Sequence, residues 1–210
     1  MAQLPFRLHR SQLTIATVLT LVTAICLLLL TYLFGNHLLF LYLNADLGGL
    51  ADVFFHYFTY LGEAIPWIAA LILILSFQKK AFWLLLFCFL ISTLFAQGIK
   101  NSLPPQPRPT KAIADHALIH TVKGVELHEY FSFPSGHTTT AFTIFLLAAA
   151  LINQKWVIPV GFIYALLIAY SRIYLAQHFP LDLAGGMISA TATIYLSIYL
   201  SSIIGKDKHH

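Results

Sequence analysis

The sequence predicts an all-α integral membrane protein: a six-transmembrane-helix bundle that forms a single domain over residues 1–210, with an outer interfacial helix and an outer loop. Of the 210 residues, 59% are hydrophobic and only 10% are charged, and the mean hydropathy is +0.78. Soluble domains do not have this composition. The apolar runs include several that are long enough to cross a hydrocarbon core of about 30 Å.

The first transmembrane helix is predicted at about 13–35, because residues 13–34 are uncharged and long enough to span the membrane. In the following region, 36–63, the apolar residues recur at helical spacing. This stripe predicts an amphipathic helix at the outer membrane interface. An extension of the next membrane helix explains it equally well. The stripe consists of Leu50, Val53, Phe54, Tyr57, Phe58 and Leu61.

The remaining crossings are predicted at about 62–78, 81–99, 136–153, 156–171 and 181–204. Short polar turns at 78–80 and 153–155 mark two of the connections between them. The segment 100–133 is different, because it is rich in proline and histidine and contains no spanning run. It is therefore predicted to be an extramembrane loop.

The basic residues orient this topology. With both termini in the cytoplasm, seven of the twelve Lys and Arg residues fall on the inner side, as the positive-inside rule expects. The net charge of +4 does not indicate a nucleic-acid partner, because basic residues occur singly or in pairs between apolar runs. In a bacterial cell the protein would lie in the inner membrane with its outer loops facing the periplasm. The inner group is Arg7, Arg10, Lys79, Lys80, Lys155, Lys206 and Lys208, and the outer group is Lys100, Arg108, Lys111, Lys123 and Arg172.

Three polar clusters lie at helix ends on the outer side. Charged groups at such depths are costly and usually belong to a functional site, and a compact bundle can bring them together. The clusters are Lys100 with Arg108, the Pro-Ser-Gly-His run at 134–137, and the stretch 171–182, which contains Arg172, His178 and Asp182.

The residue types in these clusters favour binding of a phosphoryl group. Lys100, Arg108 and Arg172 supply positive charge, and arginine can bind a phosphate through two parallel hydrogen bonds. Ser135 and Gly136 precede a helix, where free backbone N–H groups point at an anion and a glycine allows close approach. Because the clusters lie at the membrane surface, a lipid phosphate is the predicted ligand.

The two histidines add chemistry beyond binding. His178 lies one helical turn before Asp182, so the carboxylate can hold one ring nitrogen while the other attacks phosphorus. His137, on a different loop, can protonate the leaving oxygen and then activate water. The predicted cycle passes through a phosphohistidine, with the cationic side chains stabilising charge on the phosphoryl oxygens.

The three clusters also resemble, in the same order, the signatures of the type 2 phosphatidic acid phosphatase superfamily, which includes vanadium haloperoxidases and glucose-6-phosphatase-like enzymes. The resemblance implies a six-helix core and a reaction that needs no metal and no cofactor. In one departure, seven residues separate the Lys and Arg of the first signature where the family usually has six. The irregular, proline-containing stretch 101–107 is expected to absorb the extra residue. The implied roles are nucleophile for His178, its partner for Asp182, acid for His137, and phosphate ligands for Lys100, Arg108, Ser135, Gly136 and Arg172.

The resemblance implies a membrane phosphatase that hydrolyses a phosphomonoester or diphosphate of a lipid at the outer face. Undecaprenyl diphosphate, phosphatidylglycerol phosphate, phosphatidic acid and the phosphates of lipid A are the implied substrates, and the sequence does not choose among them. Selectivity is expected to reside in residues 36–63 and 110–133. Two alternatives stay open: transfer of the phosphate to another lipid, and anion binding or transport without turnover.

Some polar residues outside the clusters have competing interpretations. Glu63 either lines the site or ends a helix. His116, His120 and His128 lie in the outer loop, where their spacing admits a metal site, but solvated loop histidines are the favoured interpretation.

Overall fold

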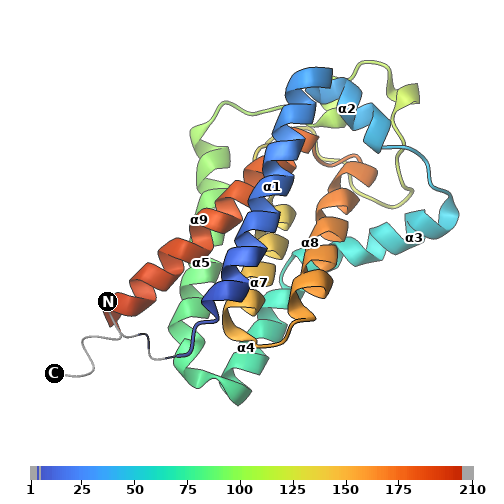
Figure 1. The fold of residues 1–210 in the computed structure, drawn as a ribbon. Helices are drawn as coiled ribbons and strands as arrows, with labels where there is room; N and C mark the ends of the chain where they lie inside the picture. The colour runs from blue at the N-terminus through green and yellow to red at the C-terminus, as the bar shows by residue number, and fades with distance from the viewer. Residues whose placement is uncertain (1–3, 5, 205–210) are drawn as a thin grey trace.

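The computed structural model of the protein describes Leu4 and residues 6–204 (Figure 1). Within these residues the chain is all-helical and has no strand, as predicted. The long helices are α1 (Arg10–Phe34), α5 (Phe82–Ser102), α7 (Gly136–Leu151), α8 (Val157–Tyr174) and α9 (Pro180–Ile204). The shorter elements are α2 (Asn36–Leu43), α3 (Gly49–Phe58), η1 (Thr59–Gly62), α4 (Ile65–Phe77), η2 (Lys79–Ala81), α6 (Pro109–Ala112) and η3 (His116–Leu118).

Helices α7 and α9 form the centre of the bundle. Helix α9 packs against α1, α5 and α7, and α7 packs in addition against α8. Figure 1 shows α9 running beside α1 through most of its length. Side chains are buried on all sides of α7, among them Phe142, Phe145 and Leu146. A helix that is apolar all round is expected to be enclosed by other helices, as α7 is here.

Four helical segments in the described part of the chain are long and apolar enough to cross a membrane: α1, Lys79–Ser102, α8 and α9. The pair Gly49–Gly62 and Ile65–Phe77, bent by 49°, would form a fifth crossing if it counts as one span. Helix α7 has 16 residues and stands where the fourth crossing is predicted. The count of six crossings therefore stays a prediction, as does the orientation. Lys206 and Lys208, which support that orientation, lie outside the described residues.

The region 36–63 departs most from the predicted helices. It forms two helices, α2 and α3, followed by the 3₁₀ turn η1. The apolar stripe of α3 points outward, with Leu50 91% exposed, while Phe55 on the other face is buried. Helix α4 begins at Ile65 and not near 62, because the chain bends at Glu63 and Pro66 occupies the first turn of the new helix. The placement of α3 at a membrane interface stays a prediction.

Two adjacent glycines bring α9 close to the start of α7. A Cβ atom on Gly186 would lie 2.8 Å from the carbonyl oxygen of Ser135 and 2.9 Å from Cβ of Thr138. A Cβ atom on Gly185 would overlap the ring of Phe133. The absence of side chains at these two positions therefore sets how closely the polar cluster at 134–137 approaches α9.

We predict that Gly186→Ala destabilises the protein. Alanine favours a helix over glycine by about 1 kcal/mol, but overpacking at this contact costs about 1–3 kcal/mol and displaces Ser135. Gly98→Ala in α5 is the matched control, because a Cβ atom there meets only Leu94 Cδ1, at 3.7 Å. Thermal unfolding in detergent should show a lower melting temperature for Gly186→Ala than for the wild type. The control should show no such decrease. A melting temperature of Gly186→Ala equal to that of the wild type would contradict the close packing.

Candidate active site

The third polar cluster is the connection between α8 and α9. The backbone N–H groups of Gln177 and His178 both donate to the carbonyl oxygen of Arg172, at 2.8 and 3.0 Å. These bonds satisfy a carbonyl at the end of α8, and Ala176 adopts a positive φ of 54° in the turn between them. Pro180 then starts α9. The tight turn holds His178 directly above the first turn of α9.

Asp182 faces His178 as the one-turn spacing predicts, with 3.4 Å between Asp182 Oδ2 and His178 Nδ1. The same oxygen accepts hydrogen bonds from the Ser132 hydroxyl at 2.5 Å and from the Phe179 backbone N–H at 2.8 Å. Both members of the pair are buried, with side chains 2% and 5% exposed. Because Nδ1 faces the carboxylate, Nε2 is the ring nitrogen left for chemistry.

The second cluster is joined to the third through the backbone. The Ser135 N–H donates to the carbonyl oxygen of Asp182 at 3.0 Å. The Ser135 hydroxyl caps α7, because it accepts hydrogen bonds from the Thr138 hydroxyl at 2.9 Å and the Thr138 backbone N–H at 3.4 Å. At Gly136 a Cβ atom would meet only Ala96 Cβ, at 3.9 Å. Packing therefore does not require the glycine at this position.

Arg108, from the first cluster, is buried and bound mainly to carbonyl groups. Its guanidinium donates to the backbone oxygens of Tyr130 at 2.9 Å and Phe131 at 3.5 Å, and to the backbone and side-chain oxygens of Gln177 at 3.1 and 3.0 Å. These four bonds tie the long loop to the third cluster. They also engage most of the N–H groups that the sequence interpretation assigned to a phosphate, so Arg108 acts here partly as a structural link.

Lys100 lies in the last turn of α5, and the irregular segment 103–108 carries the chain from there to Arg108. The stretch between them is thus partly helix and partly irregular, and it accommodates the seven-residue spacing. All three cations approach His178. Burial lowers the pKa of His178 well below its ordinary value, and the charges of Arg108, Arg172 and Lys100 lower it further. The imidazole is therefore neutral at physiological pH.

Arg172 and His137 each have a partner that lies outside the three clusters. Arg172 Nη1 donates to the Thr59 hydroxyl oxygen at 2.7 Å, whereas Arg172 Nε is buried and has no partner among the described residues. His137 Nε2 lies 3.0 Å from Glu63 Oε1. Of the two earlier interpretations of Glu63, the structure supports the one in which it lines the site.

Sequence reasoning missed Ser132, Thr59 and Gln177 as partners of site residues. Each makes contact with a residue far away in the chain, and no local spacing marks such a contact.

The interpretation of His120 as a solvated loop histidine is wrong. Its side chain is mostly buried, and Nε2 lies 2.9 Å from Asp52 Oδ1. The carbonyl oxygen and N–H of His120 are bound by Asn44. Among the described residues, Asp46, Asp52 and His120 form a group close enough to share a metal ion. His120 Nδ1 lies 3.9 Å from Asp46 Oδ1 and Nε2 lies 2.9 Å from Asp52 Oδ1, so the ring stands between the two carboxylates.

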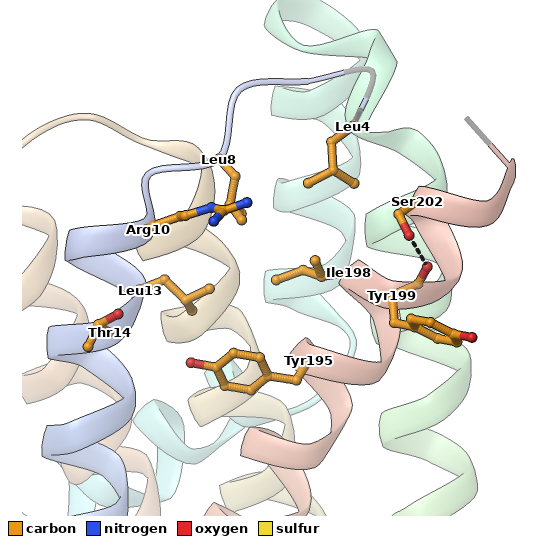
Figure 2. Close-up of a pocket in the computed structure, with 9 residues that line it drawn as sticks. All are labelled: Leu4, Leu8, Arg10, Leu13, Thr14, Tyr195, Ile198, Tyr199 and Ser202. Atoms are coloured by element: carbon orange, nitrogen blue, oxygen red, sulfur yellow. Dashed lines mark hydrogen bonds between the residues drawn. The ribbon is translucent and has the colours of Figure 1, made fainter. Parts of the chain in front are cut away.

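A pocket of about 340 Å³ lies between the N-terminal segment and the C-terminal half of α9. Figure 2 shows Tyr195 and Ile198 of α9 facing Leu8 and Leu13 across it. Asp182 stands at the opposite end of α9. This pocket is therefore separate from the histidine site.

The fold and the site together define a helical membrane protein in which a buried, carboxylate-held imidazole lies among three cationic side chains. Such a site suits an anionic ligand and a nucleophilic reaction. The chain belongs to the PAP2 superfamily, which matches residues 81–205 and so includes all three polar clusters. The family resemblance seen in the sequence is thereby confirmed.

Two curated relatives are similar over two thirds of this chain. The undecaprenyl-diphosphatase of Sulfolobus acidocaldarius is 29% identical over 147 residues, which cover 67% of this chain and 66% of that protein. The lipid A 4'-phosphatase of Bacteroides thetaiotaomicron is 29% identical over 156 residues, which cover 67% of each. The chain thus spans about two thirds of the length of these relatives. The crystal structure of Aquifex aeolicus LpxE matches with a TM-score of 0.67 and 31% identity, covering 77% of this chain and 93% of that one.

We predict that Ser132→Ala destabilises the fold by about 1–3 kcal/mol, because it removes a donor from the buried carboxylate of Asp182. Ser202→Ala is the matched control, since Ser202 is only partly buried and its hydroxyl donates to the Tyr199 carbonyl oxygen one turn earlier (Figure 2). Its effect should stay within about 0.5 kcal/mol. Thermal unfolding in detergent compares the two variants. Equal shifts in melting temperature would show that the Ser132–Asp182 bond adds nothing.

Proposed function

We propose that this protein is a metal-independent lipid phosphatase that hydrolyses a phosphomonoester or diphosphate of a membrane lipid through a phosphohistidine intermediate. The observation that supports this most strongly is the pair His178 and Asp182, buried together, with the charges of Lys100, Arg108 and Arg172 directed at the ring. The neutral imidazole can act as a nucleophile. The three cations supply the positive charge that phosphoryl transfer requires at the equatorial oxygens.

In the first step, His178 Nε2 attacks phosphorus, so that a P–N bond forms as the bond from phosphorus to the lipid oxygen breaks. Asp182 stabilises the positive charge that develops on the ring, because its carboxylate faces Nδ1. His137 gives its proton to the departing oxygen. The products are the dephosphorylated lipid, or the lipid monophosphate if the substrate is a diphosphate, and phosphohistidine.

In the second step, His137, now neutral, takes a proton from water as the water oxygen attacks phosphorus. The P–N bond breaks, inorganic phosphate leaves, and the electron pair returns to His178 Nε2. His137 is again protonated for the next cycle. The unpartnered Nε of Arg172 and the unoccupied space at the Gly136 Cβ position suit a phosphoryl group held beside the ring.

A lipid substrate follows from the position of the site and from the relatives. The names of the relatives include undecaprenyl diphosphate and lipid A as the molecules dephosphorylated. In this chain the site lies where α5, α7, α8 and α9 begin or end, within a bundle of apolar helices. With both termini in the cytoplasm and six crossings, these helix ends face the outer side of the membrane, which is the periplasm if the cell is bacterial.

The first test of this proposal measures phosphate release in detergent from phosphatidic acid, phosphatidylglycerol phosphate, undecaprenyl diphosphate and lipid A. Release from at least one of them is expected, at the same rate with and without a chelator. Appearance of the phosphate in a second lipid would indicate a phosphotransferase. Release that a chelator abolishes would contradict the metal-independent mechanism, and no turnover on any lipid would favour an anion-binding or transport function.

We predict that His178→Ala lowers kcat by at least about a thousandfold, because the nucleophile of a covalent mechanism has no substitute. His9→Ala is the matched control, since the His9 N–H bonds to the carbonyl oxygen of Ala150, at the opposite end of α7 from the proposed site. The control should keep wild-type kcat. Size-exclusion chromatography and thermal unfolding establish that both variants fold. Near-normal turnover by folded His178→Ala would refute the assignment of the nucleophile.

A further inference from the structure

The segment from Thr59 to Glu63 lies outside all three polar clusters, yet it contacts a residue in each of two of them. Thr59 binds Arg172 of the third cluster, and Glu63 binds His137 of the second. The Thr59 oxygen also accepts a hydrogen bond from the Ser171 hydroxyl at 3.1 Å. One short segment between α3 and α4 therefore supports the residues proposed as acid and as phosphate clamp.

This segment is held firmly in place against α8. The Tyr164 hydroxyl donates to the carbonyl oxygen of Leu61 at 2.6 Å. A Cβ atom on Gly62 would lie 2.7 Å from Ile168 Cγ2 and 3.1 Å from Cβ and Cδ2 of His137. The backbone at Gly62 thus packs directly against the imidazole of His137. This packing places the next residue, Glu63, beside the same ring.

The charges around His137 give Glu63 a specific task. Arg172 of α8 and Lys100 of α5 face the ring with positive charge, and His178 is close enough to interact with it electrostatically. Burial disfavours a protonated imidazole at His137 most strongly, and the nearby positive charge disfavours it further, whereas an acid must hold a proton. Glu63 is the carboxylate in contact with the ring, at 3.0 Å from Nε2.

We propose that Glu63 is a positioning residue for the acid–base reaction: it orients His137 through Nε2 and supplies the negative charge that lets this ring carry a proton among cations. With Nε2 held by Glu63, Nδ1 is the nitrogen that gives its proton to the leaving oxygen and later removes one from water. Glu63 itself does not contact the substrate. This inference rests on the proposed hydrolysis and adds a residue to it.

The test compares Glu63→Gln with the wild type over a pH series on the best substrate of the lipid panel. Glutamine keeps the shape and a hydrogen-bonding group but removes the charge, so His137 should lose its proton at lower pH. The alkaline limb of kcat is expected to move to lower pH by about one unit, with a roughly tenfold fall in kcat at pH 8 and little change in KM. Glu63→Asp, which restores the charge, should return the limb toward its wild-type position.

Lys155→Gln is the matched control, because it removes one charge from an exposed side chain that follows the C-terminal end of α7, at the opposite end of that helix from His137. Its pH profile should equal that of the wild type. An unshifted alkaline limb in Glu63→Gln would overturn the proposal, even if kcat fell, because a purely structural role lowers activity without changing the pH dependence. Thermal unfolding in detergent shows whether a fall in kcat of Glu63→Gln results from loss of folding.

A spectroscopic measurement separates this proposal from the proposed function. In protein labelled with ¹⁵N-histidine, the His137 ring signals are assigned by their absence from His137→Ala. The ring should take up its proton at lower pH in Glu63→Gln than in the wild type, whether or not a lipid is turned over. If the wild type releases no phosphate but the ring titration shifts, only the proposed hydrolysis fails. If turnover is normal but the titration is unchanged, only the role of Glu63 fails.

Discussion

The carboxylate of Asp182 is the interaction on which the arrangement of the site depends. A buried carboxylate without partners is strongly unfavourable, so each donor that reaches it fixes a piece of chain. Ser132 brings in the end of the long loop that precedes α7, the Phe179 N–H closes the turn after α8, and His178 lies against the same oxygen. The backbone carbonyl of this residue receives the Ser135 N–H. The second and third clusters are thereby joined before any ligand binds, and Arg108 adds the loop through Gln177.

The packing of the bundle allows this junction to form. Gly185 and Gly186 have no side chains, and they stand where α9 meets Phe133 and the start of α7. The backbone of the second cluster can therefore come within hydrogen-bonding distance of Asp182. The centre of the bundle is apolar on all sides, and the polar groups gather where helices end and backbone groups are free to bind. The site therefore sits at the helix ends, and the apolar interior beneath it contributes rigidity.

The sequence predicts the all-helical fold and the clustered residues well, because both leave local signals. Apolar length identifies α1 and α9, and one-turn spacing identifies the pair His178 and Asp182. The sequence does not predict contacts between residues that are distant in the chain. It also does not distinguish a lipid-facing from a protein-facing position, because both surroundings favour the same apolar side chains. Lipid and protein interior both accept the apolar faces of α3, so hydropathy alone does not show that Phe55 points inward and Leu50 outward. No sequence pattern near Thr59, Ser132 or His120 indicates its partner. The bend at Glu63 is likewise explained by a contact between distant residues, the packing of Gly62 against His137.

The two histidines of the site each lie beside a carboxylate, but the two pairs are built differently. Asp182 is buried and shares the oxygen that faces His178 with two other donors, at a distance of 3.4 Å from the ring. Its hold on a proton at His178 is therefore divided, and burial and three cations oppose that proton, which suits a ring proposed to attack in its neutral form. Glu63 is half-exposed and stands 3.0 Å from His137, which suits a ring that must accept and release a proton in each cycle. In the proposed mechanism the nucleophile and the acid are the same residue type, and we infer that the different surroundings of their carboxylates separate the two tasks.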